Sequence, residues 1–151
     1  METTSIIRTN SSNTDFLELI KKLDFYLAEK DGDEAPFFEK LNTLQNIQHV
    51  IVVYKNDIAI GCGAIKKYDE QTIEIKRMFV HPEYRNQGVA IQILNELELW
   101  AKELHFSNCI LETSKKMTEA VNLYTKYGFS VVPNYGPYIN VPDSICFQKN
   151  V

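Results

Sequence analysis

Hydrophobic residues recur along this chain with two different spacings, and each change of spacing marks a boundary between predicted elements. Between residues 14 and 29 the apolar side chains return every three or four positions, as on one face of an amphipathic helix. From His49 to Val80 they are dense and rich in Val and Ile, which is typical of strands joined by short turns. Helical spacing returns after Gln87 and again over Thr118–Tyr127.

The predicted order of elements is β-α-α-β-β-β-α-β-α-β-β, which describes one mixed α/β domain over residues 1–151. Strands are expected at Ser5–Arg8, His49–Tyr54, Ile58–Tyr68, Gln71–Val80, Asn108–Thr113, Phe129–Val132 and Ile145–Gln148. Helices are expected from Thr14 or Asp15 to about Glu29, from Pro36 to Leu44, from the loop ending at Gln87 to about Leu104, and from Thr118 to Tyr127, with Gly128 as C-cap.

Composition and charge narrow the classes of protein that this chain can belong to. Its hydrophobic share of 44% is that of a globular domain, and the longest apolar run, Val50–Tyr54, is far too short to cross a bilayer. Residues Met1–Asn10 lack the pattern of a secretory signal, so we expect a cytoplasmic protein without membrane association. The net charge of -4, without a Lys/Arg-rich run, argues against binding to nucleic acid.

The three cysteines, Cys62, Cys109 and Cys146, are widely spaced and each lies in an apolar, strand-like context. No CxxC or Cys/His spacing suggests a metal site, and an odd number argues against a disulfide framework. We therefore expect no metal, and we expect the cysteines to be small buried hydrophobic residues.

The polar loop within Val80–Ala90 connects a predicted strand to a long predicted helix. The first amides of a helix have no partner inside it, and the helix dipole favours an anion there. Gly88 stands where the helix begins, so a phosphate can approach the backbone closely, and Arg85 adds positive charge. Taken alone, the loop is also compatible with an ordinary strand–helix connection that carries a solvated arginine.

Two segments together are similar to a known family. Arg85–Ala90, R-x-x-G-x-A after a Val-x-Pro strand end, resembles the pyrophosphate-binding motif of the GNAT acetyltransferase superfamily. Downstream, Ala120–Phe129, A-x-x-L-Y-x-x-x-G-F, looks like the second signature of that family. The order of elements matches as well, so the resemblance spans essentially the whole chain and extends to a bacterial subgroup of N-acetyltransferases. It implies the GNAT acyl-CoA N-acyltransferase fold, a mixed, mostly antiparallel sheet flanked by helices and splayed where the cofactor enters.

The resemblance implies acetyl-CoA as the acetyl donor and assigns residues to it. In similar proteins the pantetheine arm lies against the main chain of the strand before the phosphate loop, here Met78, Phe79 and Val80. The phosphate contacts then fall to six consecutive residues, Arg85, Asn86, Gln87, Gly88, Val89 and Ala90. Met117 departs from the family, because many members carry there an asparagine that contacts the cofactor. Asn122 is expected to replace this contact in part.

Tyr124 occupies the position from which similar enzymes donate a proton to the departing thiol. A phenol with a pKa near 10 is protonated at neutral pH and can act as a general acid. From its spacing alone, Tyr124 would be read as one more aromatic residue on the apolar stripe of a helix.

The general base has several candidates. An amine with a pKa of about 10.4 is almost wholly ammonium at pH 7, so its proton must be removed before attack. The resemblance points to Glu74, with Glu112 on the neighbouring strand or a relaying water as alternatives, and Glu74 could instead be a solvated or ion-paired residue. Strict strand alternation predicts one face with Glu74, Lys76, Met78 and Val80 and an opposite face with Ile73, Ile75, Arg77 and Phe79.

We therefore expect an acetyl-CoA-dependent N-acetyltransferase that acts by direct transfer on the amine of a small molecule or a peptide. A non-catalytic acyl-CoA-binding module, transfer to a hydroxyl, and transfer of a longer acyl group are the alternatives. The acceptor site is expected near Phe25–Phe38 and Asn134–Ser144, where Asp31, Asp33 and Glu34 could attract a cationic amine. A homodimer is compatible with this interpretation.

Overall fold

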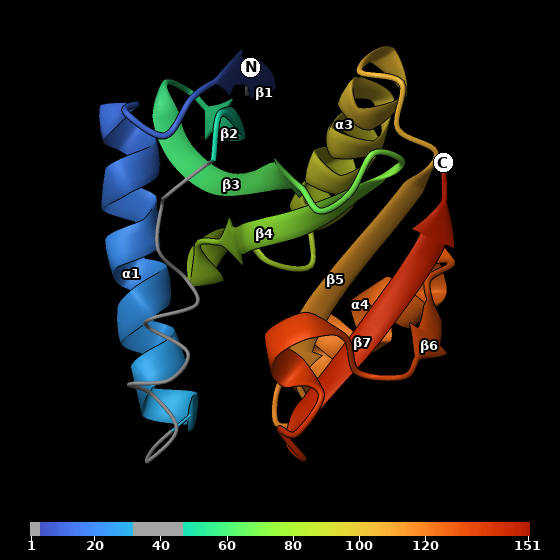
Figure 1. Ribbon diagram of the computed structural model, residues 1–151. Coiled ribbons are helices and arrows are strands. Elements are labelled where there is room, and N and C mark those ends of the chain that lie inside the picture. Colours follow the sequence, from blue (N-terminus) through green and yellow to red (C-terminus); the bar gives the residue numbers. More distant parts are fainter. Residues whose placement is uncertain (1–3, 32–46) are drawn as a thin grey trace.

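The computed structural model describes residues 4–31 and 47–151, which form a mixed seven-stranded sheet in the order β1-β2-β3-β4-β5-β7-β6, flanked by helices (Figure 1). The strands are β1 (Thr4–Thr9), β2 (His49–Lys55), β3 (Ile58–Lys67), β4 (Thr72–Val80), β5 (Asn108–Ser114), β6 (Ser130–Val132) and β7 (Ser144–Asn150). The helices are α1 (Thr14–Asp31), α3 (Val89–Glu103) and α4 (Thr118–Tyr127), with short 3-10 turns η2 (Pro82–Tyr84) and η3 (Gly136–Tyr138). The helix predicted over Pro36–Leu44 lies outside the described residues.

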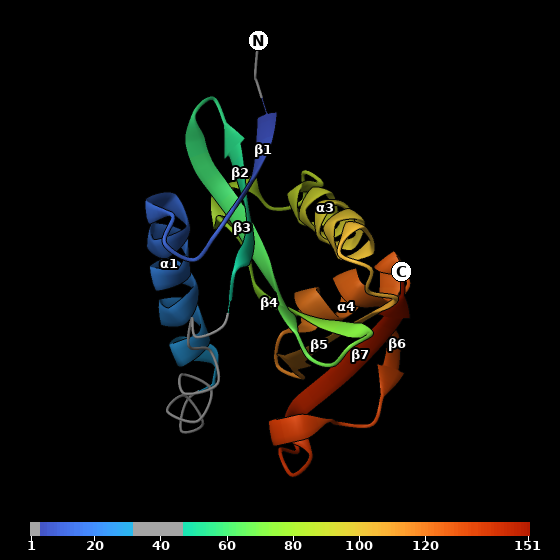
Figure 2. The ribbon, with the colours of Figure 1, turned by 45° about the horizontal axis from the view of Figure 1, so that its top comes forward.

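The sheet splits between β4 and β5, its only parallel pair within the described residues. These strands pair only where Thr72, Ile73 and Glu74 face Asn108–Ile110, and beyond Glu74 they diverge (Figures 1 and 2). The prediction of a mixed, mostly antiparallel and splayed sheet is therefore confirmed. From Ile75 to Val80, β4 has no partner strand on its β5 side, so this edge is open to a ligand.

Helix α1 covers one face of the sheet, and α3 and α4 cover the other. The stripe predicted on α1 is buried against β2 and β3, with Phe16 and Leu19 almost inaccessible to solvent. On the opposite face Ile93, Leu94 and Leu97 of α3 are fully buried, as their helical spacing predicts. Helix α1 is capped by Asn13, whose side-chain oxygen accepts from the Phe16 amide at 2.9 Å, and not by either predicted cap.

A β-bulge in β4 overturns the predicted alternation of its side chains. Arg77 has a φ of 59°, and the register against β3 shifts between Cys62 and Ala64. The extra residue turns both Lys76 and Arg77 to the α1 side of the sheet. The α3 side therefore holds Ile73, Ile75, Met78 and Val80, and the α1 side holds Glu74, Lys76, Arg77 and Phe79.

The bulge is fastened to α1 by a buried ion pair. The Arg77 side chain is 1% exposed, and its guanidinium lies 2.5 Å from an Asp24 oxygen and 3.5 Å from the Ile20 carbonyl. Asp24 is half exposed, and two further guanidinium nitrogens of Arg77 are buried without a hydrogen bond in the described structure. The pair thus joins α1 to the point where the sheet splits.

The cysteines are buried, as predicted from their apolar contexts. Burial raises the pKa of the Cys62 and Cys109 thiols to about 12, so their thiolates are scarce at neutral pH. Burial also raises the pKa of Cys146. These thiols are therefore poor candidates for an acyl-cysteine intermediate.

Two kinds of feature are missing from residues 4–31 and 47–151. Their helices are too short or too polar to span a bilayer. Their His, Cys, Asp and Glu side chains do not gather in groups of three or more that could hold a metal ion.

Candidate functional site

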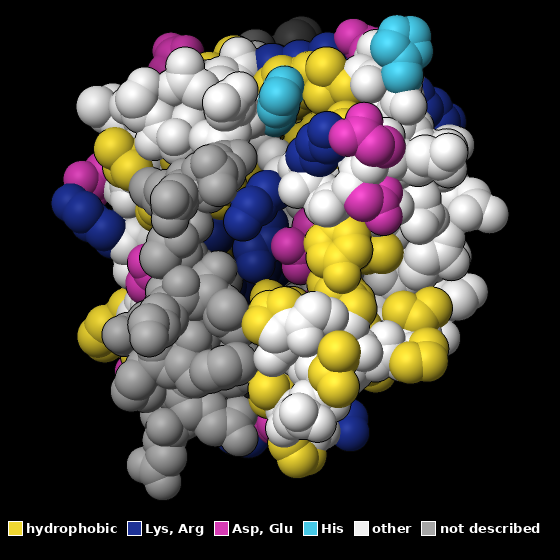
Figure 3. All heavy atoms as spheres, viewed as in Figure 1, with side chains coloured by type: hydrophobic (Ala, Val, Ile, Leu, Met, Phe, Trp, Pro, Cys, Tyr) yellow, Lys and Arg dark blue, Asp and Glu magenta, His cyan; other side chains and the backbone are white. Residues whose placement is uncertain are grey.

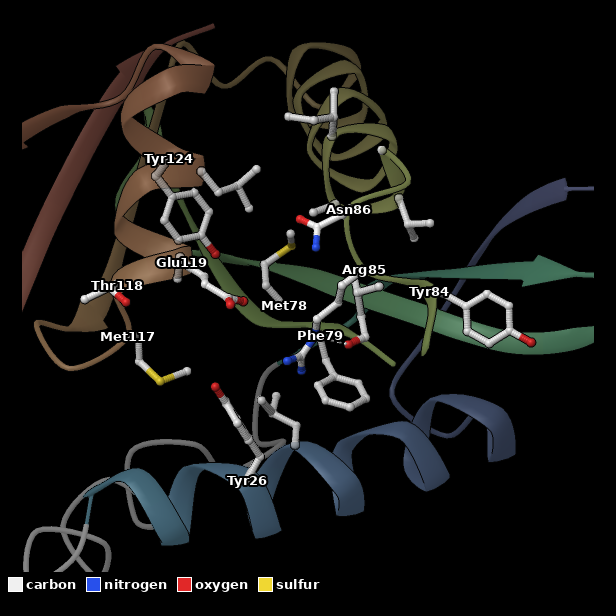
Figure 4. A pocket seen from close by; sticks show the side chains of 18 of the residues that line it. Tyr26, Met78, Phe79, Tyr84, Arg85, Asn86, Met117, Thr118, Glu119 and Tyr124 are labelled. Atoms are coloured by element: carbon white, nitrogen blue, oxygen red, sulfur yellow. Dashed lines mark hydrogen bonds between the residues drawn. The ribbon is translucent and has the colours of Figure 1, made fainter. Parts of the chain in front are cut away.

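A cavity of about 400 Å³ lies where the sheet splits (Figure 4). Its walls are the open edge of β4, the loop before α3, the first turns of α3 and α4, and Leu23 and Tyr26 from α1. Met78, Phe79 and Val80, which the resemblance assigns to the pantetheine arm, line it. We call this space the donor cavity. Because β5 has left this edge of β4, the main-chain groups of this segment that face away from β3 can pair with an extended ligand.

The first turn of α3 forms one end of the donor cavity. Gly88 is the N-cap of the helix, with a left-handed φ of 82°, and the amides that follow have no helical partner. A Cβ on Gly88 would meet nothing within 4 Å, so the backbone is open there and an anion can approach it. Asn86, Val89 and Ala90 line the same end. The arrangement is that of an anion-binding helix terminus.

Arg85 is held beside this helix terminus. Its Nε donates to the Val80 carbonyl at 2.9 Å, and its guanidinium carbon lies 5.2 Å from the Tyr26 ring centre and 5.8 Å from that of Phe79. The other N–H donors of Arg85 make no hydrogen bond to residues 4–31 or 47–151. The side chain therefore offers fixed positive charge and donors to a phosphate.

The start of α4 contributes residues of which only Met117 was indicated by the sequence. Figure 4 shows Met117, Thr118 and Glu119 at the wall opposite α3, with the Glu119 side chain directed into the cavity. Lys116 lines the same wall. Met117 was noted as the position where many family members carry an asparagine, whereas the position of the other three residues just before the second signature is the only sequence feature that could have drawn attention to them.

Tyr124 lies at the inner end of the donor cavity. The residue is 6% exposed, and its hydroxyl points into the cavity (Figure 4). The ring packs on Phe129 and Phe147, while the hydroxyl makes no hydrogen bond within the described residues. Burial and the negative charge of Glu112 raise the pKa of Tyr124, so the phenol remains protonated well above neutral pH. The side chain can serve both as a core residue and as a proton donor.

A second cavity, of about 120 Å³, adjoins the first and shares Tyr124, Met78 and Leu23 with it. We call it the acceptor cavity. Its ionisable residues are Glu74, Lys76, Arg77, Glu112, Tyr124 and Tyr138, of which Arg77 is paired with Asp24, and its apolar wall includes Leu27 and Leu111. In Figure 3, basic and acidic side chains lie side by side near the middle of the face that looks out between α1 and β7.

Glu74 is buried and engaged on both carboxylate oxygens. Its Oε2 accepts from the Tyr135 hydroxyl at 2.6 Å, and its Oε1 lies 4.0 Å from the Lys76 Nζ. Edge-on ring contacts with Tyr68 and Tyr138 hold Tyr135 in place. Burial, followed by the charge of Glu74, raises the pKa of Tyr135, so its hydroxyl keeps its proton and donates to Glu74. Glu74 is thus an oriented carboxylate, not a solvated one.

Glu112 lies across the same cavity on β5. Its Oε2 accepts from the Ser144 hydroxyl at 2.6 Å. The loop that carries η3 is shaped by Asn134, whose side-chain nitrogen lies within 3.2 Å of the Tyr138, Val141 and Ser144 carbonyls. This loop brings Tyr135 and Tyr138 over β4. From the sequence, the segment Asn134–Ser144 was assigned to the acceptor site, but these two tyrosines were given no role.

Two predicted cofactor residues do not line the donor cavity. Gln87 is exposed, and its side chain bonds to Lys55 and to the Glu83 carbonyl. Asn122 is exposed on α4 and reaches neither cavity, so the structure does not support it as a substitute for the asparagine missing at Met117. The acidic residues predicted near the acceptor, Asp33 and Glu34, lie outside the described residues.

Comparisons with known proteins agree with this geometry. A sequence model described as "Acetyltransferase (GNAT) domain" matches residues 46–131. A protein named "IAA acetyltransferase" from Azospirillum brasilense is 30% identical over 151 residues, covering 99% of each chain. A GNAT family acetyltransferase from Elizabethkingia anophelis with acetyl-CoA bound superposes with a TM-score of 0.71 at 22% identity, covering 98% of each chain. A PaiA N-acetyltransferase from Thermoplasma acidophilum in complex with coenzyme A gives 0.70 at 17% identity, covering 99% of each.

Proposed function

The chain belongs to the GNAT acetyltransferase family and is an acyltransferase, and from this premise we propose that it moves the acetyl group of acetyl-CoA directly to an amine of a small molecule or peptide. The observation that carries this proposal is the meeting of two cavities at Tyr124. One is bounded by an anion-binding helix terminus, and the other contains oriented carboxylates.

The residues of the donor cavity suit the parts of acetyl-CoA. The helix terminus at Gly88 and the guanidinium of Arg85 offer donors and positive charge to the pyrophosphate. The open main chain of Met78–Val80 offers hydrogen bonds to the amides of the pantetheine arm. In this arrangement the thioester lies near Tyr124, and a backbone amide near Val80 is suited to stabilise the oxyanion.

The acceptor amine is proposed to lose its proton to Glu74, directly or through water. Its nitrogen then attacks the thioester carbonyl carbon, the carbon–sulfur bond breaks, and the nitrogen gives up a second proton as the amide forms. Tyr124 supplies a proton to the departing thiolate, which its raised pKa permits because the phenol is protonated at neutral pH. Glu112 is the second candidate for the base, since it lines the same cavity.

Calorimetric titration with acetyl-CoA, followed by free-thiol detection with a panel of amines, alcohols and longer acyl-CoA donors, tests the proposal. We expect binding of acetyl-CoA and thiol release that depends on an amine. Binding without thiol release from any acceptor would contradict catalysis by this site. Release that requires a hydroxyl acceptor, or a longer acyl chain, would replace N-acetylation by that reaction.

A further inference from the structure

The acceptor cavity contains a pair of opposite charges that do not neutralise each other fully. Glu74 and Lys76 are 11% and 10% exposed at their side chains, yet Glu74 Oε1 and Lys76 Nζ lie 4.0 Å apart. This separation is too long for a direct hydrogen bond. Both groups line the cavity because they are two residues apart in β4, before the bulge, and therefore lie on the same side of the strand.

Lys76 in particular has capacity for another partner. An ammonium carries three donors, and Lys76 uses one toward the Tyr138 hydroxyl at 3.3 Å. Burial lowers the pKa of Lys76, because the loss of water outweighs the attraction of Glu74 and Glu112. An additional anion in this cavity would therefore stabilise the charged form of Lys76.

The two carboxylates favour the opposite charge. Tyr135 occupies Oε2 of Glu74, Oε1 lies 4.0 Å from Lys76 Nζ, and Glu112 adds a second negative charge. An ammonium group bound at Glu74 would lie next to the positively charged Lys76. Lys76 would therefore repel a ligand that carries only positive charge. A molecule with adjacent positive and negative groups meets both residues with opposite charge.

We propose that the acceptor is a free α-amino acid, with its amine at Glu74 and its carboxylate at Lys76. This inference rests on the proposed function and specifies its substrate. In an α-amino acid the two charged groups are separated by a single carbon, which suits two side chains whose charges lie 4.0 Å apart. The leucine side chains of the cavity wall, Leu23, Leu27 and Leu111, favour an apolar amino acid.

The reaction then converts the amino acid and acetyl-CoA into an N-acetyl amino acid and the free thiol of coenzyme A. One carbon–nitrogen bond forms and one carbon–sulfur bond breaks. The ammonium nitrogen loses two protons in all, one before attack and one as the amide forms, while one proton reaches the sulfur and the other is released to solvent. The product keeps its carboxylate but can no longer carry positive charge on nitrogen, so its attraction to Glu74 is lost and its release is favoured.

The test compares amino acids with amines that lack only the carboxylate. Thiol release is measured for L-leucine against isoamylamine and for L-phenylalanine against phenethylamine. A charged hydrogen-bonded partner changes binding by about 10- to 100-fold, so we expect kcat/KM to favour the amino acids by this factor. Lys76→Met should remove that preference, mainly by raising KM for the amino acids, and Lys76→Arg should restore part of it.

Lys67→Met is the matched control, because Lys67 is an exposed lysine of β3 that pairs with Glu70 on the surface. It should leave the preference unchanged. Equal or better acetylation of the carboxylate-free amines by the unmodified enzyme would overturn the amino-acid inference alone. An unchanged preference in a folded Lys76→Met protein would overturn the role of Lys76. Absence of thiol release with every amine would overturn the proposed function as well.

Discussion

The donor cavity and the acceptor cavity share Tyr124 but are built in different ways. Nearly consecutive residues, from Met78 to Ala90, form much of the donor cavity, which includes an open strand edge and a helix terminus. The acceptor cavity is formed by side chains of α1, β4, β5 and η3, which are distant in the sequence. Tyr135 and Glu74, for example, are 61 residues apart and share a 2.6 Å hydrogen bond.

This difference matches the difference between the two proposed ligands. A donor common to a family can be bound by backbone, which many sequences can present in the same way. An acceptor that differs from enzyme to enzyme requires side chains that can change without altering the fold. A short motif is therefore enough to predict the class of reaction, whereas the choice of acceptor depends on residues that only folding brings together.

The largest expected effect is at the donor cavity. Gly88→Glu places a negative charge where the proposed pyrophosphate lies and strains a residue with a φ of 82°. We expect acetyl-CoA binding to weaken by more than about 100-fold in calorimetric titration, because the added carboxylate repels the phosphates.

Gly88→Ala is the matched variant, since it introduces the same backbone strain without charge. It should cost about 1 kcal/mol of stability and retain measurable binding. Normal binding by a folded Gly88→Glu protein would show that the phosphates lie elsewhere.

The second largest effect is expected on kcat, from a substitution at Tyr124, where the two cavities meet. Tyr124→Phe removes one hydroxyl that has no hydrogen bond in the described structure, so the fold should be little affected. We expect kcat to fall by about 100-fold with acetyl-CoA affinity nearly unchanged, because a general acid acts in the transition state.

Tyr127→Phe on the same helix is the control for this prediction. Its hydroxyl binds Asn95 and Glu98 outside both cavities, so its loss should alter stability and not kcat. Because the pKa of Tyr124 is raised, kcat of the unmodified enzyme should not fall as pH rises through 10. An unchanged kcat in Tyr124→Phe, with chemistry shown to limit turnover, would leave Tyr124 only its packing role.

The third prediction separates the carboxylates of the acceptor cavity. Glu74→Gln should lower kcat/KM by about 10-fold or more at neutral pH, because the acceptor then lacks a base. The loss should shrink as pH rises toward the pKa of the acceptor amine, since solution then supplies the free amine. A pH–rate profile measures both effects.

Glu112→Gln provides the comparison for the base, and Glu70→Gln on the surface provides the control. Rescue by high pH in Glu112→Gln, with full activity in Glu74→Gln, would move the base to β5. A loss in Glu74→Gln that does not depend on pH would indicate that this carboxylate positions the acceptor instead.

The smallest effect concerns the link between α1 and the bulge. Asp24→Asn leaves the guanidinium of Arg77, which is 1% exposed, without its carboxylate. We expect the free energy of unfolding to fall by about 1–3 kcal/mol, less than for a fully buried pair because Asp24 is half exposed. Chemical denaturation measures this change.

Glu18→Gln on the same helix breaks an exposed pair with Lys21 and should change stability by less than about 0.5 kcal/mol. Equal effects of the two variants would show that the buried pair does not fasten α1 to the sheet. A larger rise in KM for the acceptor than for acetyl-CoA in Asp24→Asn would indicate that α1 shapes mainly the acceptor cavity.

Several features followed from the sequence because they depend on neighbouring residues. Helical spacing identified the buried faces of α1 and α3, and Gly128 ends α4 with a left-handed φ of 109°. The anion-binding terminus at Gly88 was predicted for the same reason, since a helix start and a glycine are local properties. Motif spacing likewise placed Tyr124 at the cavity.

Other features were decided only by tertiary structure. Arg77 lies on the same side of β4 as Glu74 and Lys76 because of the bulge, and it pairs there with Asp24, 53 residues away, so strict alternation placed Arg77 on the wrong face. Asn122 was misplaced because two residues turn a helix by about 200°, which directs it away from the side of Tyr124. The Tyr135–Glu74 contact joins distant segments and leaves no local pattern. The loop and helix start at Gly88 depend on residues that are neighbours in the sequence, whereas the acceptor cavity forms only where separate elements pack together.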